Sequence, residues 1–144
     1  MELSRNSHHV FYLHYHFVWI PKYRHKVLVG PCREALITII RQASYNYDME
    51  VTELEMPPDH IHLTIKALPR HSPADIMQTL KSISAREFFQ QFPDVRAKYF
   101  WGGQLWTESY YVETVGRWNE EEAQAYVKSQ LRELDRQEQQ LKLC

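Results

Sequence analysis

Cysteine is scarce in this chain, and its two residues have neither the number nor the spacing of a disulfide framework or a structural zinc site. We therefore expect a protein of a reducing compartment. Long apolar runs are also absent: no stretch of about eighteen apolar residues occurs, which argues against a membrane-spanning helix. The first residues, "MELSRNSHHVFYLHYHFVW", lack the apolar segment of a secretory signal. The sequence thus predicts a cytoplasmic protein without a membrane partner.

A large excess of charge of one sign is missing too. The net charge is −1, so the chain is not globally basic, and a role with nucleic acid would need a local basic face. Residues 1–48 hold six Lys and Arg against three acids, and "PKYRHK", residues 21–26, mixes cations with Tyr23. This segment is either a solvated turn or a contact surface for phosphates and bases, and charge alone leaves both open.

The 144 residues, 44% of them hydrophobic, are typical of one compact domain, residues 1–144, and no low-complexity linker divides them. Hydrophobic periodicity and capping signals predict the order β-α-β-β-α-β-α, an α+β domain with an antiparallel sheet and two helices on one face. The predicted elements are a strand over 10–20, a helix over 32–47, a hairpin of strands over 50–56 and 60–68, a helix over 72–92 with Ser72 as N-cap, a strand or strand pair over 104–116, and a long helix over 119–143 with Asn119 as N-cap. The tail of the last helix has few apolar residues, so we expect an appendage that packs on a partner chain.

The stretch "PPDHIHL", residues 57–63, places two histidines one residue apart on a predicted strand. Side chains two apart on a strand point to the same face, so we expect His60 and His62 to project together, with Ile61 buried opposite them. Such a pair can be ordinary histidines or metal ligands, and the spacing alone leaves both open. Asp59, directly before the pair, could orient an imidazole as a hydrogen-bond acceptor.

A second pair with the same spacing, His14 and His16, lies in "HYH" on the first predicted strand, without an acid beside it. We therefore favour the later pair as the metal site. No cysteine is near it, which argues against structural zinc, whereas an oxygen ligand together with phosphate oxygens would suit Mg²⁺ or Mn²⁺. Tyr126 and Gln130, four residues apart, share one face of the last helix. Either Tyr126 simply packs on the sheet, or it attacks a phosphate while Gln130 lends its carbonyl oxygen to the ion.

The motifs "PPDHIHL", "WTESYYVETVG" and "AYVKSQ", in this order, resemble the signatures of the single-tyrosine HUH transposases of the insertion-sequence 200/605 class, with the related REP-associated tyrosine transposases. "YHFVWIPKYRHKVL" also resembles the family's first strand and basic turn, and the likeness extends from about Tyr15 to Gln130. It implies a ferredoxin- or RRM-like HUH fold followed by a mobile helix, 119–143, that carries the nucleophile Tyr126. His60, His62 and Gln130 match the family's metal ligands.

The resemblance also implies an activity: metal-dependent cleavage and rejoining of single-stranded DNA at insertion-sequence ends, through a 5′-phosphotyrosine intermediate. In the first predicted strand, His16 matches a family position and His14 does not. The adjacent tyrosines Tyr110 and Tyr111 are alternative nucleophiles, which we interpret as structural because they lie on a predicted strand.

As partners, the resemblance implies DNA with subterminal hairpins and a second copy of the chain, in a bacterial or archaeal cytoplasm at the nucleoid. Gly116 and residues 117–119 could form the hinge of the mobile helix. Charge and position make five residues candidates for contact with the DNA backbone: Lys22, Tyr23, Arg24, Lys81 and Arg86.

Two other functions stay open on the residues alone. "HLT", residues 62–64, resembles half of the paired motif of two-histidine phosphoesterases that act on RNA ends, although no second copy occurs in the chain. The second open function is that of a non-catalytic nucleic-acid-binding module, since aromatic side chains on a sheet can stack with bases.

Overall fold

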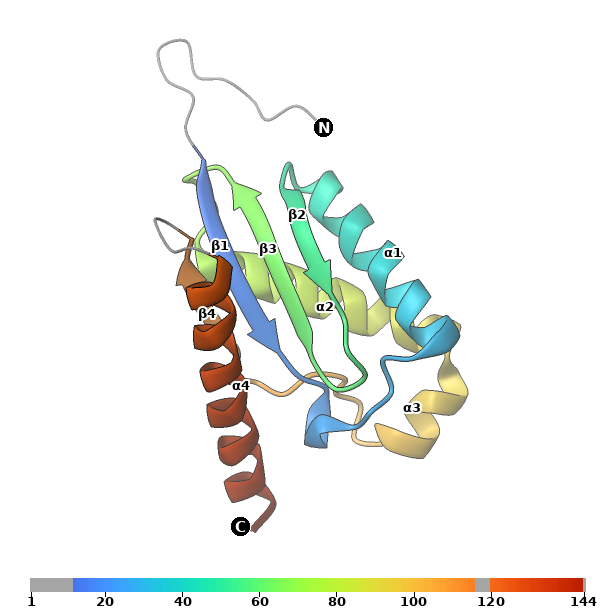
Figure 1. Ribbon diagram of the computed structural model, residues 1–144. Helices are drawn as coiled ribbons and strands as arrows, with labels where there is room; N and C mark the ends of the chain where they lie inside the picture. The colour runs from blue at the N-terminus through green and yellow to red at the C-terminus, as the bar shows by residue number, and fades with distance from the viewer. Residues whose placement is uncertain (1–11, 116–119, 144) are drawn as a thin grey trace.

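The computed structural model describes the backbone of residues 12–115 and 120–143, and their side chains except those of 120–123, 126 and 140–143. Four strands form one antiparallel sheet in the order β2-β3-β1-β4 (Figure 1). The predicted hairpin is present, because β2 pairs with β3. The strands are β1 (Leu13–Trp19), β2 (Glu50–Glu55), β3 (Ile61–Ala67) and β4 (Tyr111–Thr114).

The described helices follow the predicted order, with two short additions. They are the 3₁₀ turn η1 (Lys22–Arg24), α1 (Gly30–Asn46), α2 (Pro73–Gln91), α3 (Pro93–Tyr99) and α4 (Glu120–Leu143). The strand order is that of a ferredoxin-like β-α-β-β-α-β unit, with α1 and α2 packed together on one face. The predicted α+β class is confirmed. None of the helices in the described ranges has the length and apolar content needed to cross a membrane.

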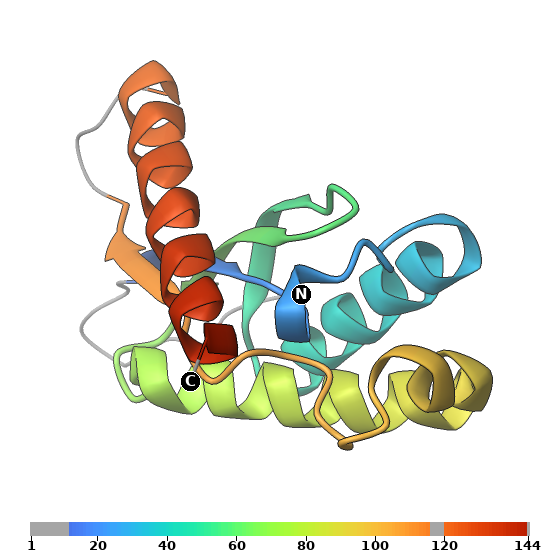
Figure 2. The ribbon, with the colours of Figure 1, turned by 90° about the horizontal axis from the view of Figure 1, so that it is seen from below.

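Strand β1 separates two apolar layers because its side chains alternate between the two faces of the sheet. Phe17 and Trp19, both fully buried, point into the main core with α1 and α2. Val18 points the other way, into a smaller cluster that contains Val127 and Leu134 of α4. The two helical layers therefore lie on opposite sides of the sheet (Figure 2).

Helix α2 starts where its capping signals predict. The side chain of Ser72 accepts a hydrogen bond from the backbone N–H of Asp75, 3.1 Å away, and Pro73 occupies the first helical position. A cap of this kind stabilises a helix by about 1 kcal/mol. Leu80 and Phe88, both fully buried, then fix the helix against the sheet.

The strand predicted over 104–116 was too long, since β4 covers only residues 111–114. The reason is a side chain: the ammonium of Lys81 donates hydrogen bonds to the carbonyls of Thr107, Glu108 and Ser109, at 2.7, 3.3 and 3.1 Å. These carbonyls thus bond to a lysine instead of a neighbouring strand. Just before them, Trp106 forms an isolated bridge with Pro21.

Helix α3 was not predicted, although Pro93 and Asp94 are ordinary signals for a helix start. It has only seven residues, too few for a clear periodic pattern. Val95 and Tyr99, four residues apart, place its apolar side against the main core.

Helix α4 is not the appendage that its polar tail predicted. In its second half, Leu134 and Glu138 are only 5% and 3% exposed, so the tail also packs against the rest of the chain. The predicted N-cap, Asn119, and the predicted hinge, residues 116–119, lie outside the described residues. Mobility of the helix stays a prediction.

The three bonds from Lys81 make a testable contribution to stability. We expect Lys81→Met, which keeps most of the stem and removes the ammonium, to lower the free energy of unfolding by about 1–3 kcal/mol, because three carbonyls lose their donor. Urea denaturation followed by circular dichroism measures the change. The matched control is Lys128→Met on the exposed side of α4, which should change stability little; equal effects from both variants would contradict the role given to Lys81.

Candidate active site

His60 lies at the entrance of β3 and is held there by an acid. Its Nδ1 is 2.9 Å from Oδ1 of Asp59, and the other carboxylate oxygen of Asp59 is 3.0 Å from Nε of Arg24. A histidine that binds a metal through Nε2 commonly donates its Nδ1–H to a carboxylate, which fixes the ring. Asp59 stands in that relation to His60.

His62 follows on the first residues of β3, and fully buried Ile61 points to the opposite face, as the alternation predicted. The Nε2 of His62 faces the Nε2 of His16 on the neighbouring strand, and the two rings stack with centroids 4.1 Å apart. The sequence hypothesis set His16 aside as part of the less favoured pair. It missed this contact because the register of β1 against β3, which places Val18 opposite His62, cannot be read from the sequence.

His16 is buried and His62 is partly buried, and this changes the pKa of both rings. Burial, together with the neighbouring imidazole of His62, lowers the pKa of His16 to about 4. Burial also lowers the pKa of His62 to about 4, with a contribution from His60. Both rings are therefore neutral near pH 7, and the neutral imidazole is the form that binds a metal.

Two carboxylates border the stacked rings. Glu55 lies 3.7 Å from Nδ1 of His62, and Glu113 lies 3.8 Å from Nδ1 of His16, both beyond hydrogen-bonding distance. Burial raises the pKa of Glu113. The Nδ1 of His16 is buried without a hydrogen-bond partner in the described chain. One buried ring nitrogen of the site therefore has no hydrogen-bond partner within the described residues.

Two neighbouring side chains, His60 and Arg24, stabilise the charged carboxylate of Asp59. Burial alone would raise its pKa, but the hydrogen bond with His60 and the charge of Arg24 lower it overall. Asp59 is therefore ionised at neutral pH. Arg24 has a second carboxylate partner, Asp135 of α4, at 3.0 Å, so one guanidinium joins the loop before His60 to the last helix.

The turn η1 that carries Arg24 has an uncommon backbone. Tyr23 and Arg24 have φ angles of 58° and 53°, in the left-handed region that bulky residues rarely occupy. Such conformations cost about 1–3 kcal/mol each and cluster at functional sites. Here the backbone N–H of Tyr23 donates to the buried carboxylate of Glu138, 2.9 Å away. The C-terminal half of α4 thus helps to hold η1 in this conformation.

Helix α4, the helix in whose sequence Tyr126 and Gln130 lie, packs on the histidine face of the sheet. Val127, the residue after Tyr126, packs in the same cluster as Val18, and Val18 is the cross-strand partner of His62. Gln130 is partly buried one turn further along the helix. The side chain of Tyr126 itself lies outside the described residues.

The donor set can be tested against the predicted ion. Two neighbouring imidazoles, one oriented by Asp59, and an amide oxygen on the facing helix provide nitrogen and oxygen ligands of the kinds that bind divalent cations. Within the described residues, no group of three His, Cys, Asp or Glu side chains has metal-binding geometry. The types of donor present, two imidazoles and the amide of Gln130 on α4, are compatible with such an ion, and metal binding stays a prediction.

The residues predicted to contact DNA do not lie together. Lys22, Tyr23 and Arg24 are on η1, whereas Lys81 and Arg86 are on α2. Lys81 is occupied by three backbone carbonyls, and burial lowers its pKa to about 8 in spite of the opposing charge of Glu108. DNA contact by each of the five stays a prediction.

Comparison with known proteins gives consistent matches over most of the chain. The family model described as "Transposase IS200 like" matches residues 9–130. The ISDra2 transposase TnpA of Deinococcus radiodurans is 38% identical over 130 residues, which are 90% of this chain and 92% of that protein. The transposase for insertion sequence element IS200 of Salmonella typhimurium is 36% identical over 129 residues, 90% of this chain and 83% of that one.

Solved structures agree. A crystal structure of a candidate transposase from Deinococcus radiodurans R1 has a TM-score of 0.75 and 37% identity, and the match covers 89% of this chain and 98% of that one. The REP-associated tyrosine transposase bound to a REP hairpin has a TM-score of 0.54, with coverage of 88% and 68%. Its identity of 12% supports the fold alone.

These matches define the class of protein: a transposase, an enzyme that cleaves DNA and transfers its strands. The chain belongs to the IS200-like transposase family.

The double role of Arg24 leads to a prediction about stability. Arg24, Asp59 and Asp135 are 26%, 22% and 32% exposed, so their ion pairs are partly shielded from water. We expect Arg24→Met to lower the free energy of unfolding by about 1–2 kcal/mol and to increase hydrogen exchange in the second half of α4.

A matched control is the pair of Arg70 and Asp48, whose side chains are both 58% exposed. Arg70→Met should cost about 0–1 kcal/mol, as exposed pairs do. Unchanged exchange of α4 in Arg24→Met would contradict the tether between η1 and this helix.

Proposed function

We propose that this transposase cleaves and rejoins single-stranded DNA at the ends of its insertion sequence, with Tyr126 as the nucleophile and a divalent cation at His60 and His62. One observation carries the proposal: the helix with Tyr126 and Gln130 packs on the same face of the sheet that presents His62. A helix on the other face would have left the tyrosine and the histidines on opposite sides of the sheet.

In the proposed reaction, the phenol oxygen of Tyr126 attacks the scissile phosphorus, and the bond from phosphorus to the 3′ oxygen breaks. The products are a 5′-phosphotyrosine and a free 3′-hydroxyl, because the phenol loses a proton and the leaving oxygen gains one. The new ester keeps the energy of the phosphodiester, so attack by a 3′-hydroxyl can rejoin DNA without ATP. Free tyrosine has a pKa of about 10, so the phenol needs activation at neutral pH.

The residues around the phosphate have separate roles in this proposal. His60, held by Asp59, and neutral His62 offer ring nitrogens, and Gln130 offers its amide oxygen from the facing helix. A bound Mg²⁺ or Mn²⁺ would supply positive charge that polarises the scissile phosphate. His16 stacks on His62 and thereby limits the rotation of its ring.

The proposed partners are DNA hairpins near the element ends and a second copy of the chain. Hairpin binding is supported by the REP-associated transposase of similar fold, which was solved with a REP hairpin. A homodimer rests on the family resemblance. Within one chain, α4 packs on its own sheet, and the proposed dimer includes exchange of this helix between the two copies.

The nucleophile assignment predicts that Tyr126→Phe forms no covalent complex with single-stranded element ends, because only the phenol oxygen is removed. Denaturing gel electrophoresis after incubation with Mn²⁺ detects the complex as a protein–DNA band. Binding of the hairpin, measured by gel shift, should stay near the wild-type level.

Tyr110→Phe is the matched control for this experiment. Tyr110 packs against Phe17 in the main core side of the sheet, with ring centroids 6.2 Å apart, away from the histidine face. Its substitution should leave the covalent complex intact. Adducts that persist in Tyr126→Phe and disappear in Tyr110→Phe would reverse the assignment.

The ligand assignment predicts that His62→Ala loses metal-dependent cleavage by about 10- to 100-fold or more, since loss of a residue that merely supports a metal ligand already costs 10–100-fold. Cleavage of a labelled oligonucleotide is followed with and without EDTA, and a thermal melt verifies the fold. His14→Ala, the partner of the less favoured pair, should cleave normally. Cleavage that resists EDTA but is lost in His62→Ala would favour a metal-independent phosphoesterase instead, and cleavage that survives His62→Ala would contradict the ligand role of His62.

A further inference from the structure

A pocket of about 290 Å³ is lined in part by η1, the turn whose Arg24 pairs with Asp59, and has no role in the chemistry above. Two segments line it: residues 22–23 of η1, and residues 99–102 and 104, which begin at the last residue of α3. Four of these residues are aromatic, and Lys22 supplies a positive charge. Aromatic faces beside a cation are the elements from which proteins build sites for unpaired nucleotides.

Trp101 is the most unusual residue of this pocket, because its side chain is 85% exposed. Trp19 and Trp106, by comparison, are fully buried and 5% exposed. A single exposed apolar side chain is common on protein surfaces, but this indole leaves a large burial energy unrealised and lines a pocket together with the half-exposed ring of Tyr23. A partner that covers its face would provide that energy.

The backbone around Trp101 is fixed although its side chain is exposed. The N–H of Phe100 donates to the carbonyl of Arg96 at 2.9 Å, and the N–H of Gly103 donates to the carbonyl of Phe100 at 2.7 Å. Phe100 is buried, and Gly103 has a φ of +89°, which a residue with a side chain would rarely adopt. Trp101 therefore stands at the tip of a closed turn, and little backbone entropy is lost when its ring is covered.

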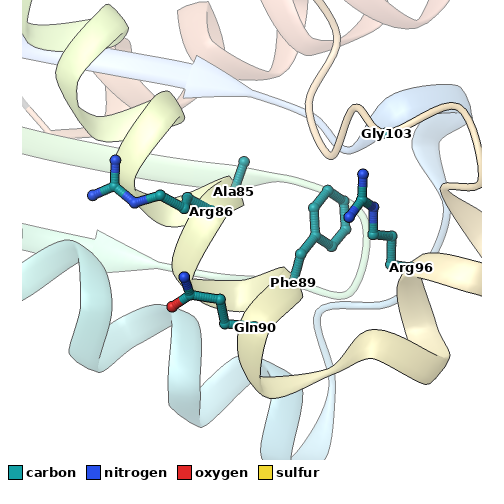
Figure 3. Close-up of a pocket in the computed structure, with 6 residues that line it drawn as sticks. All are labelled: Ala85, Arg86, Phe89, Gln90, Arg96 and Gly103. Atoms are coloured by element: carbon teal, nitrogen blue, oxygen red, sulfur yellow. The ribbon is translucent and has the colours of Figure 1, made fainter.

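Cations lie on both sides of this turn. On one side, the ammonium of Lys22 is 5.5 Å from the ring centroid of Tyr23. On the other side, Arg96 stacks over Phe89 at 5.2 Å and, with Arg86, lines a second pocket of about 470 Å³ that reaches Gly103 (Figure 3). No acid is among the described residues that line the two pockets. This charge pattern is complementary to phosphates on either side of a stacked base.

We propose that this pocket binds one unpaired base of single-stranded DNA, stacked on Trp101, with the neighbouring phosphates held by Lys22 and Arg96. Gln104, also in the lining, provides amide groups for the edge of the base. The inference rests on the proposed function and names a contact site for its substrate. Arg24, which follows Tyr23, joins η1 to Asp59 and hence to His60, so DNA bound in the pocket lies at the metal-binding end of the sheet.

The first test measures binding of a fluorescein-labelled oligothymidylate to the full chain by fluorescence anisotropy. Loss of a base stack predicts that Trp101→Ala binds roughly 5- to 150-fold more weakly, and that Trp101→Phe recovers most of the affinity. The matched control is Tyr45→Ala, which removes another exposed aromatic ring, 58% exposed on α1. Equal affinities of Trp101→Ala, Tyr45→Ala and wild type would overturn the proposal.

The second test separates stacking from charge. For single strands, the logarithm of the binding constant falls with the logarithm of salt by about 0.7 per phosphate contact. Lys22→Ala should reduce this slope by about that amount, whereas Trp101→Ala should weaken binding with the slope unchanged. A slope that falls equally in both variants would overturn the stacking role of Trp101.

Failure of the pocket proposal can be distinguished from failure of the proposed function. If the wild type forms covalent DNA complexes but Trp101→Ala binds normally, the pocket assignment fails and the transposase chemistry stands. If the wild type forms no covalent DNA complexes and Trp101→Ala still binds more weakly, the transposase chemistry fails and the pocket assignment stands. Normal DNA affinity together with a changed sedimentation coefficient in Trp101→Ala would identify the surface as a protein contact and overturn the proposal.

Discussion

The arrangement of this transposase depends on the burial of one apolar stripe of α4 against the second face of the sheet. Val127 and Leu134 cover Val18 and Ile20, and each such side chain contributes roughly 1.5–3 kcal/mol when it leaves water. Because Val18 is paired across the strands with His62, the contact that stabilises the helix also determines which side chains face it. Stability and placement of the candidate nucleophile thus have one physical origin.

Polar contacts complete this placement in the C-terminal half of the helix. Arg24 joins Asp59 and Asp135, and Glu138 accepts the N–H of Tyr23. These contacts hold η1 in a backbone conformation that costs energy, and the same turn borders both the histidine site and the pocket of Trp101. Ion pairs in a partly shielded position contribute less to stability than apolar packing, so these contacts orient η1 more than they stabilise the helix.

Much of the fold could be predicted because its signals are local. The caps and periodicity of α2, the alternation of β1 and β3, and the Pro-Pro turn between β2 and β3 are properties of neighbouring residues. The predictions of local structure were wrong where a residue far away in the sequence determines the backbone conformation. Lys81 binds the carbonyls of residues 107–109 and thereby shortens the last strand, and nothing within 104–116 indicates that lysine. The short helix α3 had signals at its start but too little length for periodicity.

The sequence by itself determined the family resemblance, the α+β class and the identity of the candidate residues, because these depend on residue types and their spacing along the chain. Only the tertiary structure decided that His16 stacks on His62, that α4 covers the histidine face of its own sheet, and that Trp101 stands exposed beside Lys22. Each of these contacts joins residues far apart in the chain. Strand register and helix packing create them, and both are set by the sum of many weak contacts throughout the core instead of by any local motif.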